Sequence, residues 1–243
     1  MSATNSMPSI SVVNSARVLL ALGAAISFAV SGRCQPGGYS GRPFGDSVYH
    51  DGAQKIPGKV QCAYYDFGGE GVAYHTEDTK NKGSGSFNKP DGTYLNEFRM
   101  NEAVSISYTK FDHSTQIDDN PFNLVVPPKN QLYVGWSKPG EWFNMTVEVR
   151  EAGEYAIDLL YTSHQGGNIA LEWNGKPLAG PIAVLSTFNE ADPVKWRNWH
   201  HWNLMKSIAV VSLPKGVGVL TFKLITEGNM NLAYLDFHPT GRP

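Results

Sequence analysis

The chain has 243 residues, of which 41% are hydrophobic and 17% charged, and its formal net charge is −2. A chain of this length and composition buries one sizeable core, so we expect one folded domain and exclude extended disorder. The small, mixed charge excludes a partner chosen by charge, such as a nucleic acid or an acidic lipid surface.

The N-terminal segment, residues 1–34, predicts a secretory signal peptide. A basic residue precedes an unbroken apolar run at residues 18–30, and small residues follow it, which is the order found in such signals. The run is shorter than the roughly 20 apolar residues of a membrane span. We therefore expect cleavage near residues 32–34, no membrane insertion of the mature chain, and a secreted, periplasmic or cell-surface location. An uncleaved anchor and a lipid on Cys34 remain as alternatives, although Arg33 stands where lipidation needs a small residue.

Residues 35–55 are rich in Gly and Pro and lack periodicity, so we expect an extended lead-in there. Residues 56–240 differ, because short β-branched or aromatic segments alternate with Gly, Pro or Asn. No window sustains a helical repeat. The expected strands are Val60–Phe67, Ala103–Tyr108, Leu132–Trp136, Trp142–Val149, Tyr155–Tyr161, Ile169–Trp173, Ile208–Leu213, Val219–Ile225 and Leu232–Phe237.

This pattern predicts an all-β fold, an antiparallel β-sandwich or jelly roll. The Asn174-Gly175 pair is the strongest hairpin signal in the chain, because both residues tolerate the left-handed backbone of a two-residue turn. Cys62 falls inside an apolar segment and is expected as a small buried core residue.

Several motifs occur in order along residues 56–240. They are Ile56–Val60 (IPGKV), 68–75 (GGEGVAYH), Val134–Trp136 (VGW), Gly140–Trp142 (GEW), Ala152–Tyr155 (AGEY), Leu213–Gly216 (LPKG) and Asn231–Phe237 (NLAYLDF). Together they resemble a family 6 carbohydrate-binding module, a galactose-binding-like β-sandwich that is usually appended to polysaccharide-degrading enzymes. The resemblance covers roughly residues 45–240.

The resemblance implies a binding site in loops at one end of the sandwich, where two aromatic rings grip a sugar and an asparagine bonds it. Trp136 matches the first ring. Two overlapping Trp-x-x-Trp elements offer the second ring, so Trp199 is the preferred choice and Trp196 and Trp202 are the alternatives. Asn231 matches the asparagine. The chemistry agrees, because a flat indole covers the apolar face of a pyranose while an amide bonds its hydroxyls.

Any one of these tryptophans could instead pack under a loop. Polar neighbours, including Arg197, Asn198, His200 and His201, argue against burial of the whole element, because each would need a partner. Trp142 matches a position that in some members of the family forms a second cleft on a sheet face. A core role is the alternative for Trp142.

Many members of the family hold a structural calcium through a Glu-x-Glu pattern on the first strand. This chain has Gln61 and Ala63 at those places, which leaves Gln61, Asp66 and Asp236 as oxygen donors. Calcium gains affinity with each added carboxylate, so the expected site, at Gln61 and Asp236, is weak. No other cofactor is expected.

The sequence therefore predicts non-catalytic binding of a polysaccharide or oligosaccharide, a β-glycan such as glucan, xylan or agarose, by a monomer. A secreted lectin or adhesin for other glycans is the alternative. A small glycoside hydrolase is the rival class, since such enzymes need only two carboxylates in a cleft. The candidate carboxylates are Asp66, Glu70, Glu77, Asp78 and Glu141.

Overall fold

The computed structural model describes residue 1, residues 38–50 and residues 52–241. The predicted signal peptide, Cys34 and the first residues of the predicted lead-in lie outside this part of the chain. Within the described residues, no helix has the length and apolar character needed to cross a membrane.

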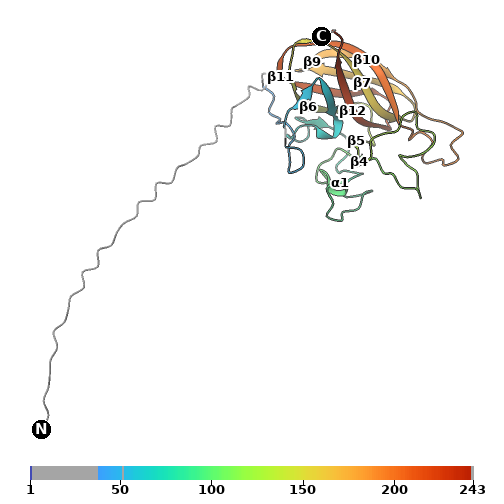
Figure 1. Cartoon of the computed structure of the whole chain (residues 1–243), viewed down its shortest axis with the longest axis horizontal. Coiled ribbons are helices and arrows are strands. Elements are labelled where there is room, and N and C mark those ends of the chain that lie inside the picture. Colours follow the sequence, from blue (N-terminus) through green and yellow to red (C-terminus); the bar gives the residue numbers. More distant parts are fainter. Residues whose placement is uncertain (2–37, 51, 242–243) are drawn as a thin grey trace. The chain divides into compact units, whose positions relative to one another are not determined.

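Two β-sheets form the fold (Figure 1). The first sheet has the order β1 (Gln54–Ile56), β6 (Trp142–Val149), β11 (Gly216–Thr226), β8 (Gly167–Trp173) and β9 (Lys176–Val184), with β3 (Tyr74–His75) also pairing with β6. The second has the order β10 (Asn203–Leu213), β7 (Gly153–Ser163), β12 (Met230–Pro239), β5 (Leu132–Val134) and β4 (Ile106–Tyr108), with β2 (Gly58–Gln61) also pairing with β12. The pairs are antiparallel except β1 with β6, so the predicted antiparallel β-sandwich is confirmed.

Alternate side chains of the long strands fill the core. Phe143 and Phe222 lie opposite each other on β6 and β11, and their rings stack with centroids 5.2 Å apart. Ile157 and Leu159 on β7 face the same core and are fully buried. Because side chains on a strand alternate between its two faces, the residues between them point to the other face of the sheet.

The predicted strand at Trp142–Val149 has the observed bounds of β6. The predicted hairpin also forms, because Trp173 pairs with Lys176 and the two residues between them have positive φ, 51° at Asn174 and 72° at Gly175. Positive φ at both central residues is the geometry that Asn-Gly favours in a two-residue turn.

The predicted strand Val60–Phe67 is only partly correct. Strand β2 ends at Gln61, and Cys62–Tyr64 form a short 3-10 turn, η1. Cys62 and Ala63 are both fully buried, whereas consecutive residues of a strand would point to opposite faces. The burial of Cys62 itself is as predicted.

Part of the predicted lead-in belongs to the fold. Arg42 and Phe67 exchange backbone hydrogen bonds of 2.9 and 2.8 Å. Phe44 is buried, and residues 54–56 form strand β1. The structured part of the chain therefore begins well before Ile56.

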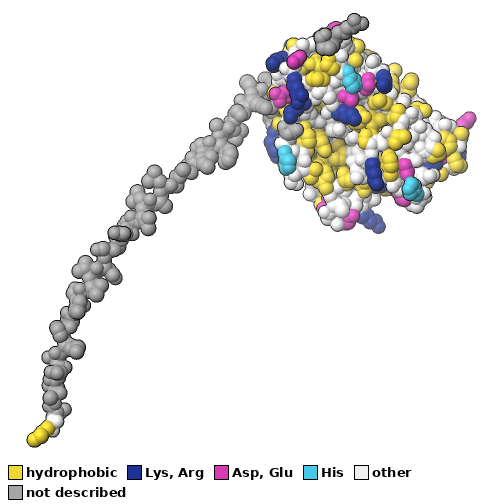
Figure 2. Space-filling model, viewed as in Figure 1, with side chains coloured by type: hydrophobic (Ala, Val, Ile, Leu, Met, Phe, Trp, Pro, Cys, Tyr) yellow, Lys and Arg dark blue, Asp and Glu magenta, His cyan; other side chains and the backbone are white. Residues whose placement is uncertain are grey.

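The long connections, together with the short helix α1 (Tyr94–Glu97), lie at the end of the sandwich marked by β4 and β5 in Figure 1. On the face shown in Figure 2, basic and acidic side chains are interspersed with apolar ones and form no field of one sign.

Candidate functional site

The predicted clamp residues lie on separate elements that meet at one end of the sandwich. Trp136 follows strand β5, Asn231 is the second residue of β12, and Trp196 and Trp199 belong to the connection 185–202 between β9 and β10. All four side chains line the same pocket. We call this pocket the clamp; its other lining residues are Phe87, Ile117, Tyr133, His200 and Asn229.

Trp136 forms one wall of the clamp. Its backbone has a φ of 52°, a left-handed conformation that is uncommon for a bulky residue and that turns the chain away from the line of β5. The half-buried ring lies 5.9 Å from the ring of Phe87, centroid to centroid. Phe87 was not predicted, because it sits in a loop with no aromatic partner nearby in sequence.

Trp199 and Trp196 form the other side of the clamp. Trp199 is half-buried and its ring lies 5.2 Å from that of His200, nearly perpendicular to it. Trp196 is 58% exposed. The exposed ring of Trp196 agrees with the prediction that at least one of the three tryptophans at positions 196, 199 and 202 faces outward.

Asn231 is buried at the floor of the clamp. Its Nδ2 donates to Thr162 Oγ1 at 2.7 Å, directly across from it on β7. Burial lowers the pKa of His200 to about 3, against an opposing hydrogen bond with the Asn231 side chain. The imidazole is therefore neutral near pH 7. From the sequence, His200 is expected only as a polar neighbour of the tryptophans, so its place in the clamp lining was not predicted.

Trp202 does not belong to the clamp, so its assignment as an alternative sugar-binding ring is wrong. The side chain is fully buried, and its Nε1–H donates to Asp118 Oδ1 at 2.7 Å. The backbone carbonyl of Trp202 accepts from the N–H groups of Leu124 and Val125. Trp202 thus joins the connection 185–202 to the loop at residues 110–131.

Asp118 is the acceptor at this junction and is itself fully buried. Its second oxygen accepts from the backbone N–H of Lys110 at 2.7 Å. Burial raises the pKa of Asp118 to about 6, and the hydrogen bonds from Lys110 and Trp202 oppose that rise. A carboxyl group with this pKa titrates just below neutral pH.

A second buried carboxylate, Asp192, shapes the connection 185–202. Arg197 donates to both of its oxygens, at 2.8 and 3.0 Å, and His201 Nε2 lies 3.0 Å from Oδ2. Burial alone would raise the pKa of Asp192, but the hydrogen bonds from Arg197 and His201 hold it well below its ordinary value. Arg197 also donates to the carbonyl groups of Thr115 and Gln116. These bonds join the connection 185–202 to the loop at residues 110–131, in addition to the bond between Trp202 and Asp118.

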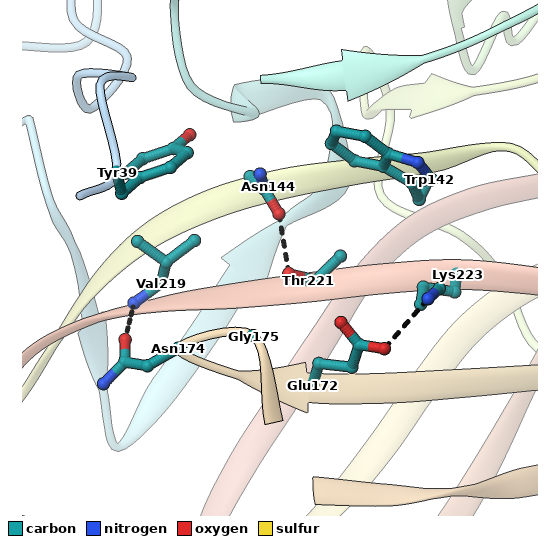
Figure 3. Close-up of a pocket in the computed structure, with 9 residues that line it drawn as sticks. All are labelled: Tyr39, Trp142, Asn144, Glu172, Asn174, Gly175, Val219, Thr221 and Lys223. Carbon is teal, nitrogen blue, oxygen red and sulfur yellow. Dashed lines mark hydrogen bonds and ion pairs between the residues drawn. The ribbon is translucent and has the colours of Figure 1, made fainter. Parts of the chain in front are cut away.

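Trp142 lies on the open face of the first sheet, half-buried and outside the core (Figure 3). It lines a second pocket that Tyr39 bounds at the opposite end. Between the two rings, Thr221 donates to Asn144 Oδ1 at 2.6 Å. Lys223 on β11 lies opposite Trp142 and pairs with Glu172 at 2.9 Å. Trp142 therefore lines a pocket on the sheet face and is not part of the core, which was the alternative role.

Gln61 and Asp236, the two residues expected to hold calcium, lie on the paired strands β2 and β12. Gln61 Oε1 accepts from Gln131 Nε2 at 2.7 Å, and Asp236 lies opposite Lys59 in the pairing of β12 with β2. Among the residues that the structure describes, no group of three or more His, Cys, Asp or Glu side chains could hold a metal ion. A cation that takes six to eight oxygens would need further donors beside Gln61 and Asp236, so weak calcium binding stays an expectation.

The candidate catalytic carboxylates lie away from the clamp. Glu70 accepts from the backbone N–H of Thr76 and pairs with His75 at 2.5 Å, whereas Asp78 pairs with Lys138 at 2.8 Å. The remaining three are held in similar contacts: Asp66 by Thr146 and Tyr39, Glu77 by Lys138, and Glu141 by Thr76. None of the five lines the clamp within the described residues.

Solved structures that resemble this chain include several carbohydrate-binding modules. The module CsCBM6-3 from Clostridium stercorarium, in complex with cellobiose, is 11% identical with a TM-score of 0.44, and the match covers 78% of this chain and 99% of that one. A carbohydrate-binding module from Cellvibrio mixtus lichenase 5A, in complex with cellotriose, is 20% identical with a TM-score of 0.35, over 45% of this chain and 79% of that one.

A third similar structure is a family 43 arabinoxylan arabinofuranohydrolase from Bacillus subtilis, in complex with cellotetraose. It is 12% identical with a TM-score of 0.46, over 81% of this chain but only 33% of the hydrolase. No protein-family model matches the chain, and no curated protein matches it.

Proposed function

We propose that this protein binds carbohydrate chains through the clamp and does not cleave them. The observation that carries the proposal is the convergence of Trp136, Trp199 and the buried Asn231 at one pocket, from three segments that are far apart in the sequence. The two half-buried indoles offer apolar platforms for a pyranose, and the asparagine offers amide groups for its hydroxyls.

The clamp is held in shape before a ligand arrives. Hydrogen bonds to Asp192 and Asp118 fix the connection that carries Trp196 and Trp199, and Thr162 fixes Asn231. Loops that are already ordered lose little conformational entropy when a ligand binds. The free energy gained by stacking is therefore not offset by the cost of ordering the loops. This supports a dedicated binding site over an incidental hollow.

Catalysis is the less favoured function. Hydrolysis of a glycosidic bond needs two carboxylates about 5–10 Å apart around the bond, and no carboxylate of the described chain lines the clamp.

We propose the same site for a lectin or adhesin role, which differs only in the glycan that is bound. The proposed setting is outside the cytoplasm, as a secreted, periplasmic or cell-surface monomer.

The proposal is tested by isothermal titration calorimetry with cello-, xylo- and agaro-oligosaccharides on the purified protein. We expect Trp136→Ala and Trp199→Ala each to weaken binding at least about tenfold, which corresponds to about 1.4 kcal/mol of lost stacking. Trp142→Ala tests separately whether the pocket between Trp142 and Tyr39 on the first sheet also binds the glycan. Val210→Ala, at a residue that is 57% exposed on β10, serves as the control.

Circular dichroism on each variant separates loss of the site from loss of the fold. Unchanged affinity in both clamp variants, with the fold intact, contradicts the proposal. The same samples are assayed for reducing sugar released from each polysaccharide that binds. Steady release that an Asp or Glu substitution abolishes would establish the enzyme instead.

A further inference from the structure

A second and larger hollow adjoins the clamp. We call it the basin; it is lined by Phe87, Ile117 and Trp196, which it shares with the clamp, and by Tyr108, Lys110 and Thr115, among others. The basin has a volume of about 620 Å³, against about 140 Å³ for the clamp. Phe87 and Trp196 therefore stand between two connected hollows, of which the clamp is the smaller.

The wall between the hollows is apolar and accessible. Phe87 is 60% exposed and Trp196 is 58% exposed, and large aromatic side chains left open to water together mark a surface used in binding. The Phe87 ring also contacts the ring of Trp136 in the clamp. An aromatic surface thus runs without interruption from the clamp into the basin.

Lys110 supplies a polar group on the basin side. Its ammonium lies 4.3 Å from the ring centroid of Tyr108 and 5.3 Å from that of Phe87. It donates to Asn88 Oδ1 at 2.8 Å and to Ser107 Oγ at 3.2 Å. An ammonium group has three donors, so one remains for a ligand, and no ion pair of the described residues involves Lys110.

The charge around the basin is balanced. Lys89 and Lys110 line it together with Asp91 and Asp112. A carboxylate or sulfate on the ligand would meet both signs of charge, whereas hydroxyl groups can bond to either. The basin therefore suits an uncharged sugar better than a uronic acid.

We propose that the basin continues the binding site, so that a neutral glycan chain held in the clamp passes over Phe87 and Trp196 and places further sugars against Tyr108 and Lys110. This inference rests on the proposed function of the clamp. It adds that the protein recognises a run of several consecutive neutral sugars, and that much of its affinity comes from those beyond the clamp.

Calorimetry with oligosaccharides of increasing length tests the inference on the purified protein. The series is taken from the neutral glycan that binds best, from disaccharide to hexasaccharide. We expect the affinity of the unmodified protein to rise at least tenfold across the series. Trp196→Ala and Lys110→Met should each remove most of that rise, and Lys110→Met should leave the disaccharide affinity unchanged. Val210→Ala should keep the full rise.

Equal affinity for disaccharide and hexasaccharide, with both lost in Trp199→Ala, would overturn the basin while leaving the clamp in place. No binding of any glycan by the unmodified protein would overturn the clamp itself. Tighter binding of hexagalacturonate than of every neutral hexasaccharide would overturn the assignment to neutral chains.

Discussion

Gly135 allows Asn231 to occupy the floor of the clamp. A Cβ atom at this position would lie 2.7 Å from Asn231 Oδ1 and 3.3 Å from the ring of Tyr133. A contact of 2.7 Å is too short to persist, so any larger residue would displace the amide. Glycine is therefore needed here for space.

Gly135→Ala is expected to weaken glycan binding about tenfold or more. The displaced amide loses its alignment with Thr162, and a lost hydrogen bond of a buried group costs about 1–3 kcal/mol. Titration calorimetry measures the change. Gly153→Ala on β7 is the matched control, because a Cβ there meets nothing within 4 Å. Equal affinity in the two variants would show that Asn231 does not bond the ligand.

The burial of Asp118 predicts a dependence of stability on pH. Its pKa of about 6 lies above the ordinary 3.8, so the folded state holds this proton more tightly than the unfolded state does. The contribution of Asp118 to the free energy of unfolding is therefore greatest below pH 3.8 and declines as pH rises to about 6. The decline amounts to about 3 kcal/mol.

Asp118→Asn removes this titration. Urea unfolding of both proteins at several values between pH 4 and pH 7 gives the difference in their free energies of unfolding. We expect the unmodified protein to lose about 2 kcal/mol relative to the variant across that range, because at pH 4 part of the total effect is already lost. Parallel pH profiles would mean that Asp118 is ionised normally in the folded state.

At the scale of elements, the strands could be predicted where they are long and rich in β-branched and aromatic residues. β6, β7, β11 and β12 fall in this group. Strand β9 was missed because Gly180 and Pro181 interrupt it and most of its side chains are exposed. The short strands β1 and β3 lack enough residues to show any alternation.

The site could be predicted in part. Sequence motifs predict the positions of Trp136 and Asn231 in the site. The motif at Val134–Trp136 marks the end of β5, and the motif at Asn231–Phe237 marks the start of β12. The same reasoning preferred Trp199 but kept Trp202, three residues later, as an alternative. Their difference depends on Asp118, 84 residues from Trp202 in the chain, and on a loop whose path no local pattern shows.

Arg197→Lys tests whether the connection 185–202 orders the clamp. Lysine cannot reproduce the paired bonds to Asp192 together with those to Thr115 and Gln116. We expect about 2 kcal/mol of destabilisation, from the loss of bonds to charged groups, and about tenfold weaker glycan binding, although Arg197 itself does not line the clamp. Thermal unfolding and calorimetry measure both effects.

Arg150→Lys, at an exposed residue next to β6, is the control for this exchange. Strand content by circular dichroism should stay the same in both variants. Destabilisation without any loss of affinity would show that the clamp keeps its shape independently of the salt bridge.

For the whole molecule, calcium is expected to contribute little to stability. Asp236 offers one carboxylate and lies opposite Lys59, and a weakly bound ligand stabilises the folded state only slightly. Differential scanning fluorimetry with and without EDTA should therefore differ by less than about 4 °C, the shift that 1 kcal/mol produces in a protein of this size. A larger fall on chelation would reveal a calcium site built from other ligands.

The double tie between the loops at 110–131 and 185–202 has a consequence for evolution and engineering. Trp202 and Arg197, on one loop, each donate hydrogen bonds to the other loop. Replacing a single loop would therefore break the bond between Trp202 and Asp118 and the bonds from Arg197 to the Thr115 and Gln116 carbonyl groups. We therefore expect the loop at residues 110–131 and the connection 185–202 to be exchangeable only together. New sugar specificities on this scaffold should therefore arise by swapping both loops at once, or by changing only the outward rings that they display.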